Sequence, residues 1–269
     1  MTLPVEYLTD LEGTEIAFDA VPESPFCFPA KTWVLVKKLD EYADPLTQKE
    51  VTDGIGISDT SAKFLCRPAG PDNADEYAFM RIHQQVPIVG TEIKKASIRA
   101  HQAVKEPENR ELVALKSFFI LGCEVVPKLL GFHQGKQDED EGVPGGFVTY
   151  IVWEKVPGES FDPVKFWLWP FSERKAFRDK FREVFGRFLN FGFMPLMPIP
   201  SKIIYDEPSG QMHISGFRFA YRLEEPEKWD EAFFFRFELA LISREPDANL
   251  MGISRNEASW VEDDNGCIW

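Results

Sequence analysis

Histidine is the first residue type to examine for acid–base or metal chemistry. The four histidines are His83, His101, His133 and His213. They lie far apart, without the HxH or HExxH spacing of a zinc site, and no GxSxG motif marks a nucleophilic serine. His213 begins the run HISGF at a strand end, where its imidazole could act as an acid or base or make a structural hydrogen bond. We therefore expect no metal site, and His213 stays a candidate for either role.

The cysteines and the first residues bear on the compartment. Cys27, Cys66, Cys123 and Cys267 are scattered and form no CxxC pair, as is typical of free thiols in a reducing compartment. The opening run MTLPVEYLTDLEG lacks the basic and apolar regions of a signal peptide. No run approaches the roughly 18 apolar residues of a membrane span. These features predict a cytoplasmic protein without a membrane span.

Composition restricts the partners. The chain has 269 residues, of which 44% are hydrophobic, including 24 phenylalanines and seven tryptophans. Its net charge is −14, whereas binding to phosphate-rich surfaces needs concentrated Lys and Arg. We therefore expect a folded acidic protein that binds no nucleic acid.

The first part of the chain alternates apolar strand runs with turns. Residues 1–30 are predicted to be irregular, because Pro22, Pro25 and Pro29 interrupt any regular element. Strands are expected at 32–39, 61–68, 76–85, 126–135 and 147–156, the last ended by Pro157-Gly158. Near-helical spacing of Leu112, Leu115 and Phe118 predicts one helix, with Gly122 as its stop.

The second part is dominated by helical spacing of aromatics. Residues 172–192 place Phe177, Phe181, Phe185 and Phe188 on one stripe, with Ser172 as N-cap and Gly192 as C-cap. Further predictions are a hairpin at 201–217, in which Asp206 starts the turn, a helix at 227–245, and a tail that folds back through Trp260 and Trp269.

This order of elements predicts an α+β fold. The change near residue 157 suggests two lobes: 1–156 with an antiparallel sheet and one helix, and 157–269 as a mostly helical, reduced lobe. The division requires the early strands and the 147–156 strand to share one sheet.

Several motifs taken together resemble the protein-kinase-like superfamily, in its aminoglycoside-phosphotransferase-like branch, and divergent fungal members of that branch. They are AFMRI, ENRELVALKSF, VPKLLGF, VTYIVWEKVPGESF and GFMPLMPIPSKIIYD. The resemblance covers roughly residues 60–240. It implies a two-lobed kinase-like fold with a ligand cleft between the lobes.

The resemblance also assigns site residues in the first lobe. Arg81 stands where the family has its phosphate-holding lysine, and Glu111 matches the helix glutamate that pairs with it. An Arg81–Glu111 bridge would favour a structural role over phosphate binding. Trp153 and Glu154 match the segment that meets adenine, where Trp153 could stack on a planar ligand or pack internally.

The matching catalytic positions lack their chemistry. Met197 stands at the catalytic aspartate, Lys202 at the metal-binding asparagine and Gly216 at the metal-binding aspartate. The apolar run MPLMPIP (194–200) replaces a polar loop and suits an apolar ligand or a partner side chain. In GIGISD (54–59), Asp59 takes the place of a third glycine, so a turn is favoured over a phosphate loop.

Three functions follow from the resemblance. The first is a pseudokinase-type ligand-binding or scaffold protein without a cofactor, whose partner is an apolar small molecule or a protein. The second is a repurposed isomerase or cyclase acting on an apolar natural product, with His213, Lys202 and Arg218 as candidate catalytic groups. The third is an atypical small-molecule phosphotransferase that uses Asp206 or Glu207. Because fold does not determine function, the sequence leaves all three open.

Overall fold

The computed structural model describes residues 5–22, 24–70, 76–242 and 260–269. The chain divides into two compact units, one of residues 1–112 with 129–155 and one of residues 113–128 with 156–269. The first division falls inside helix α3 (Arg110–Ile120), so the segment 113–128, expected in the first lobe, belongs to the second unit. Each unit is described separately below.

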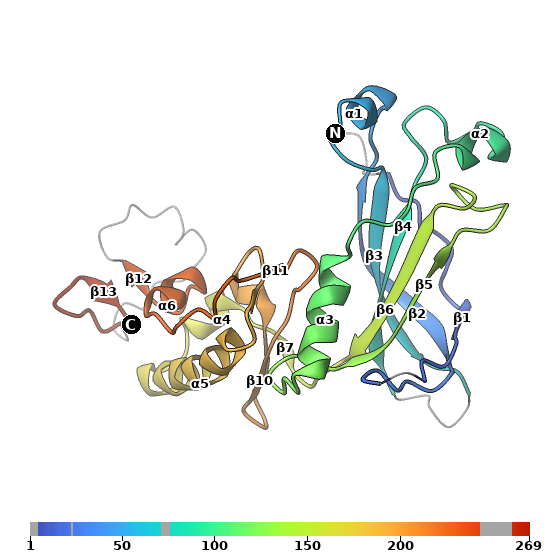
Figure 1. Cartoon of the computed structure of the whole chain (residues 1–269). Coiled ribbons are helices and arrows are strands. Elements are labelled where there is room, and N and C mark those ends of the chain that lie inside the picture. Colours follow the sequence, from blue (N-terminus) through green and yellow to red (C-terminus); the bar gives the residue numbers. More distant parts are fainter. Residues whose placement is uncertain (1–4, 23, 71–75, 243–259) are drawn as a thin grey trace. The chain divides into compact units, whose positions relative to one another are not determined.

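The first unit contains a six-stranded antiparallel sheet in the order β1-β2-β3-β4-β6-β5 (Figure 1). Its strands are β1 (Glu15–Phe18), β2 (Lys31–Asp44), β3 (Asp59–Pro68), β4 (Ala78–Gln85), β5 (Leu129–Lys136) and β6 (Phe147–Glu154). All five strands expected from the sequence are present, and the early strands share this sheet with β6. The fold is mixed, with an antiparallel sheet and few helices.

The two faces of this sheet differ because side chains alternate along each strand. One face forms an apolar core that includes Phe64 on β3, Met80 on β4 and Val152 on β6, packed against Leu8 and Phe18 from the N-terminal segment. The opposite face carries charged and aromatic side chains, considered below. The alternation therefore separates a structural face from a polar one.

Two expectations for the first unit need correction. Residues 1–30 are not wholly irregular, because Glu15–Phe18 pairs with β2 and Val21 bridges Phe28; residues 1–4 and 23 lie outside the described part. The predicted helix is α3, but two short helices, α1 (Gln48–Thr52) and α2 (Ala96–Ala100), were not expected. Thr47 and Glu50 form a reciprocal capping box that begins α1.

The second unit combines one long helix with short paired strands. Its helices beyond α3 are α4 (Pro163–Phe166), α5 (Phe171–Leu189), the 3₁₀ turn η2 (Pro200–Lys202) and α6 (Ala232–Arg236). Its strands are β7 (Glu159–Ser160), β8 (Phe193–Met194), β9 (Ile203–Asp206), β10 (Gln211–Ile214), β11 (Tyr221–Arg222), β12 (Leu241–Ile242) and β13 (Cys267–Ile268). They pair as β10-β9-β7, β11-β8 and β12-β13.

Helix α5 forms the core of this unit. The predicted stripe is buried, with Phe181, Phe185 and Phe188 fully enclosed. Phe185 lies 4.9 Å, between ring centroids, from Phe233 of α6. The N-cap prediction was wrong, because Pro170 and not Ser172 precedes the helix. At the other end Asn190 is the C-cap, and Gly192, the expected cap, follows with a φ of +69°.

The prediction of a helix at 227–245 was wrong in extent. Only the five residues of α6 are helical, and Glu238, with a φ of +56°, stands just beyond its end. Residues 243–245 lie outside the described part. The phenylalanines of this run follow helical spacing and pack on α5. Their spacing does not extend far enough along the chain to specify the longer helix.

The described end of the chain packs on the second unit through two tryptophans, as expected. Trp260 lies 5.9 Å from Trp167, and Trp269 lies 5.7 Å from Phe234, between ring centroids. The rest of the expected tail, 246–259, lies outside the described residues.

All four cysteines are free thiols, as predicted. Cys66 of the first unit and Cys123 of the second are buried, whereas Cys27 is exposed. Burial raises the pKa of the Cys66 thiol to about 12 and that of Cys123 to about 11. Within the described ranges, no helix has both the length and the apolar character needed to cross a bilayer.

Glu41 joins the N-terminal segment to the sheet of the first unit. Its carboxylate accepts hydrogen bonds from the backbone N–H of Tyr7 at 2.8 Å and the hydroxyl of Thr60 at 2.7 Å, and it pairs with Lys38. Burial alone would raise the pKa of Glu41, but these donors outweigh it and hold the pKa below its ordinary value.

We expect Glu41→Gln to lower the free energy of unfolding by about 1–3 kcal/mol at pH 7, because charge-assisted hydrogen bonds are lost. A carboxylate with a lowered native pKa stabilises above its unfolded pKa and loses that effect as pH falls through the native pKa. The deficit should therefore shrink below about pH 4.5, as measured by urea unfolding. Glu15→Gln, at an exposed position of β1, is the control, and a pH-independent deficit would contradict the assignment.

Candidate functional site

The polar face of the first sheet brings Arg81 and Glu111 together. Arg81 Nε lies 2.9 Å from Glu111 Oε2, and both side chains are almost fully buried. His83 Nε2 lies 3.2 Å from the same carboxylate oxygen, and Arg81 also approaches Asp40 at 3.6 Å. Glu111 therefore sits among cationic and hydrogen-bonding groups supplied by strand β4.

Trp153 completes this cluster. Its ring lies 5.7 Å from the Arg81 guanidinium and 6.2 Å from the Phe79 ring, and Lys63 Nζ lies 5.8 Å from it. Trp153 and Phe79 are cross-strand partners of β6 and β4, which places both rings on the polar face. Trp153 therefore has packing partners within its own unit. Glu154 is the next residue along β6 and pairs in register with Ala78.

Replacing Arg81 with Met should destabilise the protein by about 3–5 kcal/mol, because Glu111 would keep a buried charge without its main partner. Adding Glu111→Leu to Arg81→Met should restore part of that stability, since both charges are then removed. Thermal unfolding measures the stability of the single and the double variant. Equal stabilities would show that Arg81 does not stabilise the protein through its ion pair with Glu111.

The second unit holds the positions matched to a catalytic loop. Lys202 ends the turn η2, and its carbonyl oxygen accepts hydrogen bonds from the N–H of Ser215 at 2.8 Å and from the Ser215 hydroxyl at 3.1 Å. Gly216 follows with a φ of +86°. A Cβ at Gly216 would lie 2.3 Å from Lys202 Cδ and 2.8 Å from Lys202 Cε. The Lys202 stem thus fills the space that a side chain at position 216 would need.

The other candidates from the sequence are spread over this unit. Met197 is 55% exposed in the loop before η2, with Leu196 and Ile199 also exposed. His213 pairs with Ile204 across the β9–β10 hairpin, on the face opposite the buried Met212 and Ile214. The Arg218 guanidinium lies 4.7 Å from the Phe219 ring. Lys202 meets the HISGF segment at Ser215 through its backbone and at Gly216 through its stem.

Asp206 starts the hairpin turn, as predicted. Its carboxylate accepts hydrogen bonds from the Ser209 hydroxyl and the Ser209 N–H, and the Asp206 carbonyl accepts from Gly210, whose φ is +68°. These contacts give Asp206 a structural role in the β9–β10 hairpin.

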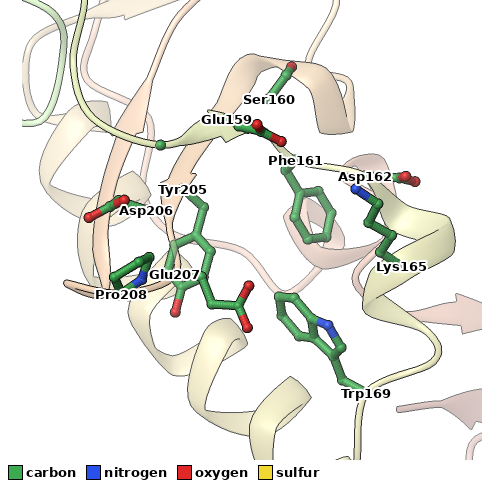
Figure 2. A pocket seen from close by; sticks show the side chains of 11 residues that line it. Glu159, Ser160, Phe161, Asp162, Lys165, Trp169, Tyr205, Asp206, Glu207 and Pro208 are labelled. Carbon is green, nitrogen blue, oxygen red and sulfur yellow. The ribbon is translucent and has the colours of Figure 1, made fainter.

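A pocket of about 470 Å³, called here the β7–β9 pocket, lies wholly within the second unit. It is lined by residues 158–162, by Lys165 and Trp169, and by residues 205–208. Figure 2 shows the rings of Phe161, Trp169 and Tyr205 around one space, with the Glu207 carboxylate directed toward it.

Gly158 allows the walls of this pocket to meet. Its φ is +94°, and a Cβ there would lie 2.3 Å from the carbonyl oxygen of Tyr205. Only glycine permits this approach, which lets β7 pair with β9 through Glu159 and Tyr205. The Tyr205 ring then meets Phe177 of α5 in a T-shaped contact at 4.9 Å.

The charge in the pocket is mainly negative. Glu159, Asp162, Asp206 and Glu207 face a single cation, Lys165. Burial, then Glu207, then Asp206 raise the pKa of Tyr205, so its phenol stays neutral at physiological pH. Sequence reasoning missed this pocket. The Pro157-Gly158 pair and the acidic turn at 206–207 were visible, but nothing indicated that they meet.

Comparison with known proteins finds likenesses among solved structures alone. No protein-family model and no curated protein matches the chain. A solved structure of a kinase of Cydia pomonella granulovirus, PK-1, is similar with a TM-score of 0.40 and 12% sequence identity. The match covers 74% of this chain and 55% of the viral kinase. The chain thus matches little more than half of that protein's length.

The contact between Lys202 and Gly216 can be tested by a double-mutant cycle. Gly216→Ala should cost about 1–2 kcal/mol from its left-handed backbone, plus the cost of displacing Lys202. In a Lys202→Ala background the second contribution disappears, so the two changes should couple by at least about 0.5 kcal/mol. Chemical unfolding of the four proteins measures this coupling, and additive effects would show that the stem does not fill the space.

Proposed function

We propose that this chain is a kinase-like protein that does not transfer phosphate from Mg-ATP and acts as a ligand-binding or scaffold protein. The observation that carries the proposal is the Lys202 stem lying over Gly216. Phosphoryl transfer needs acidic or amide groups that hold Mg²⁺ against the phosphates. The motif order assigns Lys202 and Gly216 to the positions of the metal ligands. Lys202 is a cation, and its stem occupies the space that a carboxylate side chain at position 216 would need.

The pairing of strand β4 with helix α3 through one ion pair supports the kinase-like part of the proposal. Arg81 on β4 pairs with Glu111 on α3, which is the arrangement of the strand lysine and helix glutamate in protein kinases. The guanidinium is also held by Asp40 and the Trp153 ring, so its contacts are structural. Assignment to the aminoglycoside-phosphotransferase-like branch and to its fungal members is part of the same proposal and rests on the sequence motifs. The proposed cytoplasmic location rests on the scattered free cysteines.

Nucleotide binding is the decisive test. ATP would be titrated into the full chain with and without Mg²⁺, and thermal stability followed alongside an active kinase. A nucleotide at 100-fold its dissociation constant stabilises by about 2.7 kcal/mol. We expect no Mg²⁺-dependent change in the midpoint of unfolding for this chain.

A clear Mg²⁺-dependent rise in that midpoint would overturn the proposal in favour of an atypical phosphotransferase. Asp206→Asn and Glu207→Gln would then show whether these acids hold the metal. Turnover of an apolar substrate without nucleotide would favour the repurposed isomerase or cyclase, for which the exposed Leu196, Met197 and Ile199 offer an apolar surface.

A further inference from the structure

The β7–β9 pocket has two carboxylates with no partner in the described part of the chain. Asp162 accepts a hydrogen bond from the Val164 N–H at 2.9 Å, and Asp206 is engaged by Ser209. The carboxylates of Glu159 and Glu207, by contrast, make no hydrogen bond or ion pair among the described residues. Negative charge is therefore available to a ligand, in a chain whose net charge is already −14.

The aromatic walls add a second attraction for positive charge. The rings of Trp169 and Tyr205 lie 6.4 Å apart at an angle of 51°, and Phe161 is held behind them by stacking on Phe177 at 4.6 Å. A cation within about 6 Å of an aromatic face is attracted by the ring quadrupole, most strongly by Trp. Glu159 and Glu207 are solvent-exposed, so their attraction for a cation is screened by salt.

The kind of cation follows from how the oxygens are arranged. Calcium takes six to eight oxygen ligands at short range. Within the described residues, no three acidic, histidine or cysteine side chains are close enough to hold a metal ion. A volume of about 470 Å³ with aromatic walls instead fits a molecule that has an apolar body around a positive charge.

We propose that the β7–β9 pocket binds a small organic cation, an ammonium group carried on an apolar body. The charged group lies between Glu207 and the rings of Trp169 and Tyr205, and Glu159 adds negative charge at the pocket (Figure 2). This site consists only of residues in the second unit, and it is separate from the Lys202–Gly216 contact.

The test uses choline and its uncharged isostere, 3,3-dimethylbutan-1-ol, which differ in charge but hardly in shape. Each is titrated into the full chain, and binding is followed by ligand-observed NMR at low salt. We expect choline to bind at least about fivefold more tightly than the alcohol, since cation–π attraction alone contributes about that factor. Added salt should weaken choline binding.

Three variants locate the binding. Glu207→Gln removes a charge with little change in shape, and Trp169→Leu removes the best aromatic face. Each should weaken choline binding by about threefold or more. Glu225→Gln, an exposed acid of the same unit outside the pocket, is the matched control and should leave binding unchanged.

Equal binding of choline and the alcohol, or no choline binding at all, would overturn the proposal. So would a Glu207→Gln variant that binds choline as tightly as Glu225→Gln. Circular dichroism of each variant shows whether the fold is kept, and the two glutamine changes are surface substitutions that should preserve it. Because the nucleotide titration reads a different ligand, either proposal can fail without the other.

Discussion

Strand β9 pairs with β10 on one side and with β7 on the other, and this pairing determines both sites of the second unit. At one end of the hairpin, Ser215 bonds to the Lys202 carbonyl, which places the Lys202 stem across Gly216. At the other end, Asp206 closes the turn and positions Glu207 at the pocket. The close approach of Gly158 to Tyr205 then holds β7 in register. A shift of one residue in this pairing would turn the Tyr205 ring away from Phe177 and dismantle the pocket.

The first unit depends on a different kind of interaction. Its core is apolar on one face of the sheet, while the other face buries the charges of Arg81 and Glu111. Buried charges cost free energy unless they are paired, so this face is specified by partner choice more than by hydrophobicity. The Trp153 ring beside the guanidinium removes water from the pair and strengthens it.

Sequence patterns predicted the elements with a long, consistent apolar signal. Strand β6 was found because it is an almost continuous run of β-branched and aromatic residues, and helix α5 because its phenylalanines recur at helical spacing. Strand β1 was missed because it has four residues and only Phe18 is buried. The short α6 was overextended because Trp229 and the phenylalanines after it follow helical spacing although the chain leaves the helix at Phe237.

The candidate sites also differ in how far they could be predicted from the sequence. Arg81 and Glu111 could be paired from motif order, because the ion pair joins two regular elements. The β7–β9 pocket could not be predicted, since Glu159, Trp169 and Glu207 come from three segments that are brought together by strand pairing and by one glycine. Local sequence patterns do not indicate which distant segments lie side by side in the folded chain.

Each unit contains a buried thiol whose rate of labelling reports how often that unit opens. Cys66 and Cys123 are enclosed in different units, and their raised pKa values leave almost no thiolate at neutral pH. An alkylating reagent would modify exposed Cys27 and half-buried Cys267 in the folded chain, and would reach Cys66 and Cys123 only when the surrounding unit opens. The rates at which Cys66 and Cys123 acquire label thus record the opening of each unit in the intact chain.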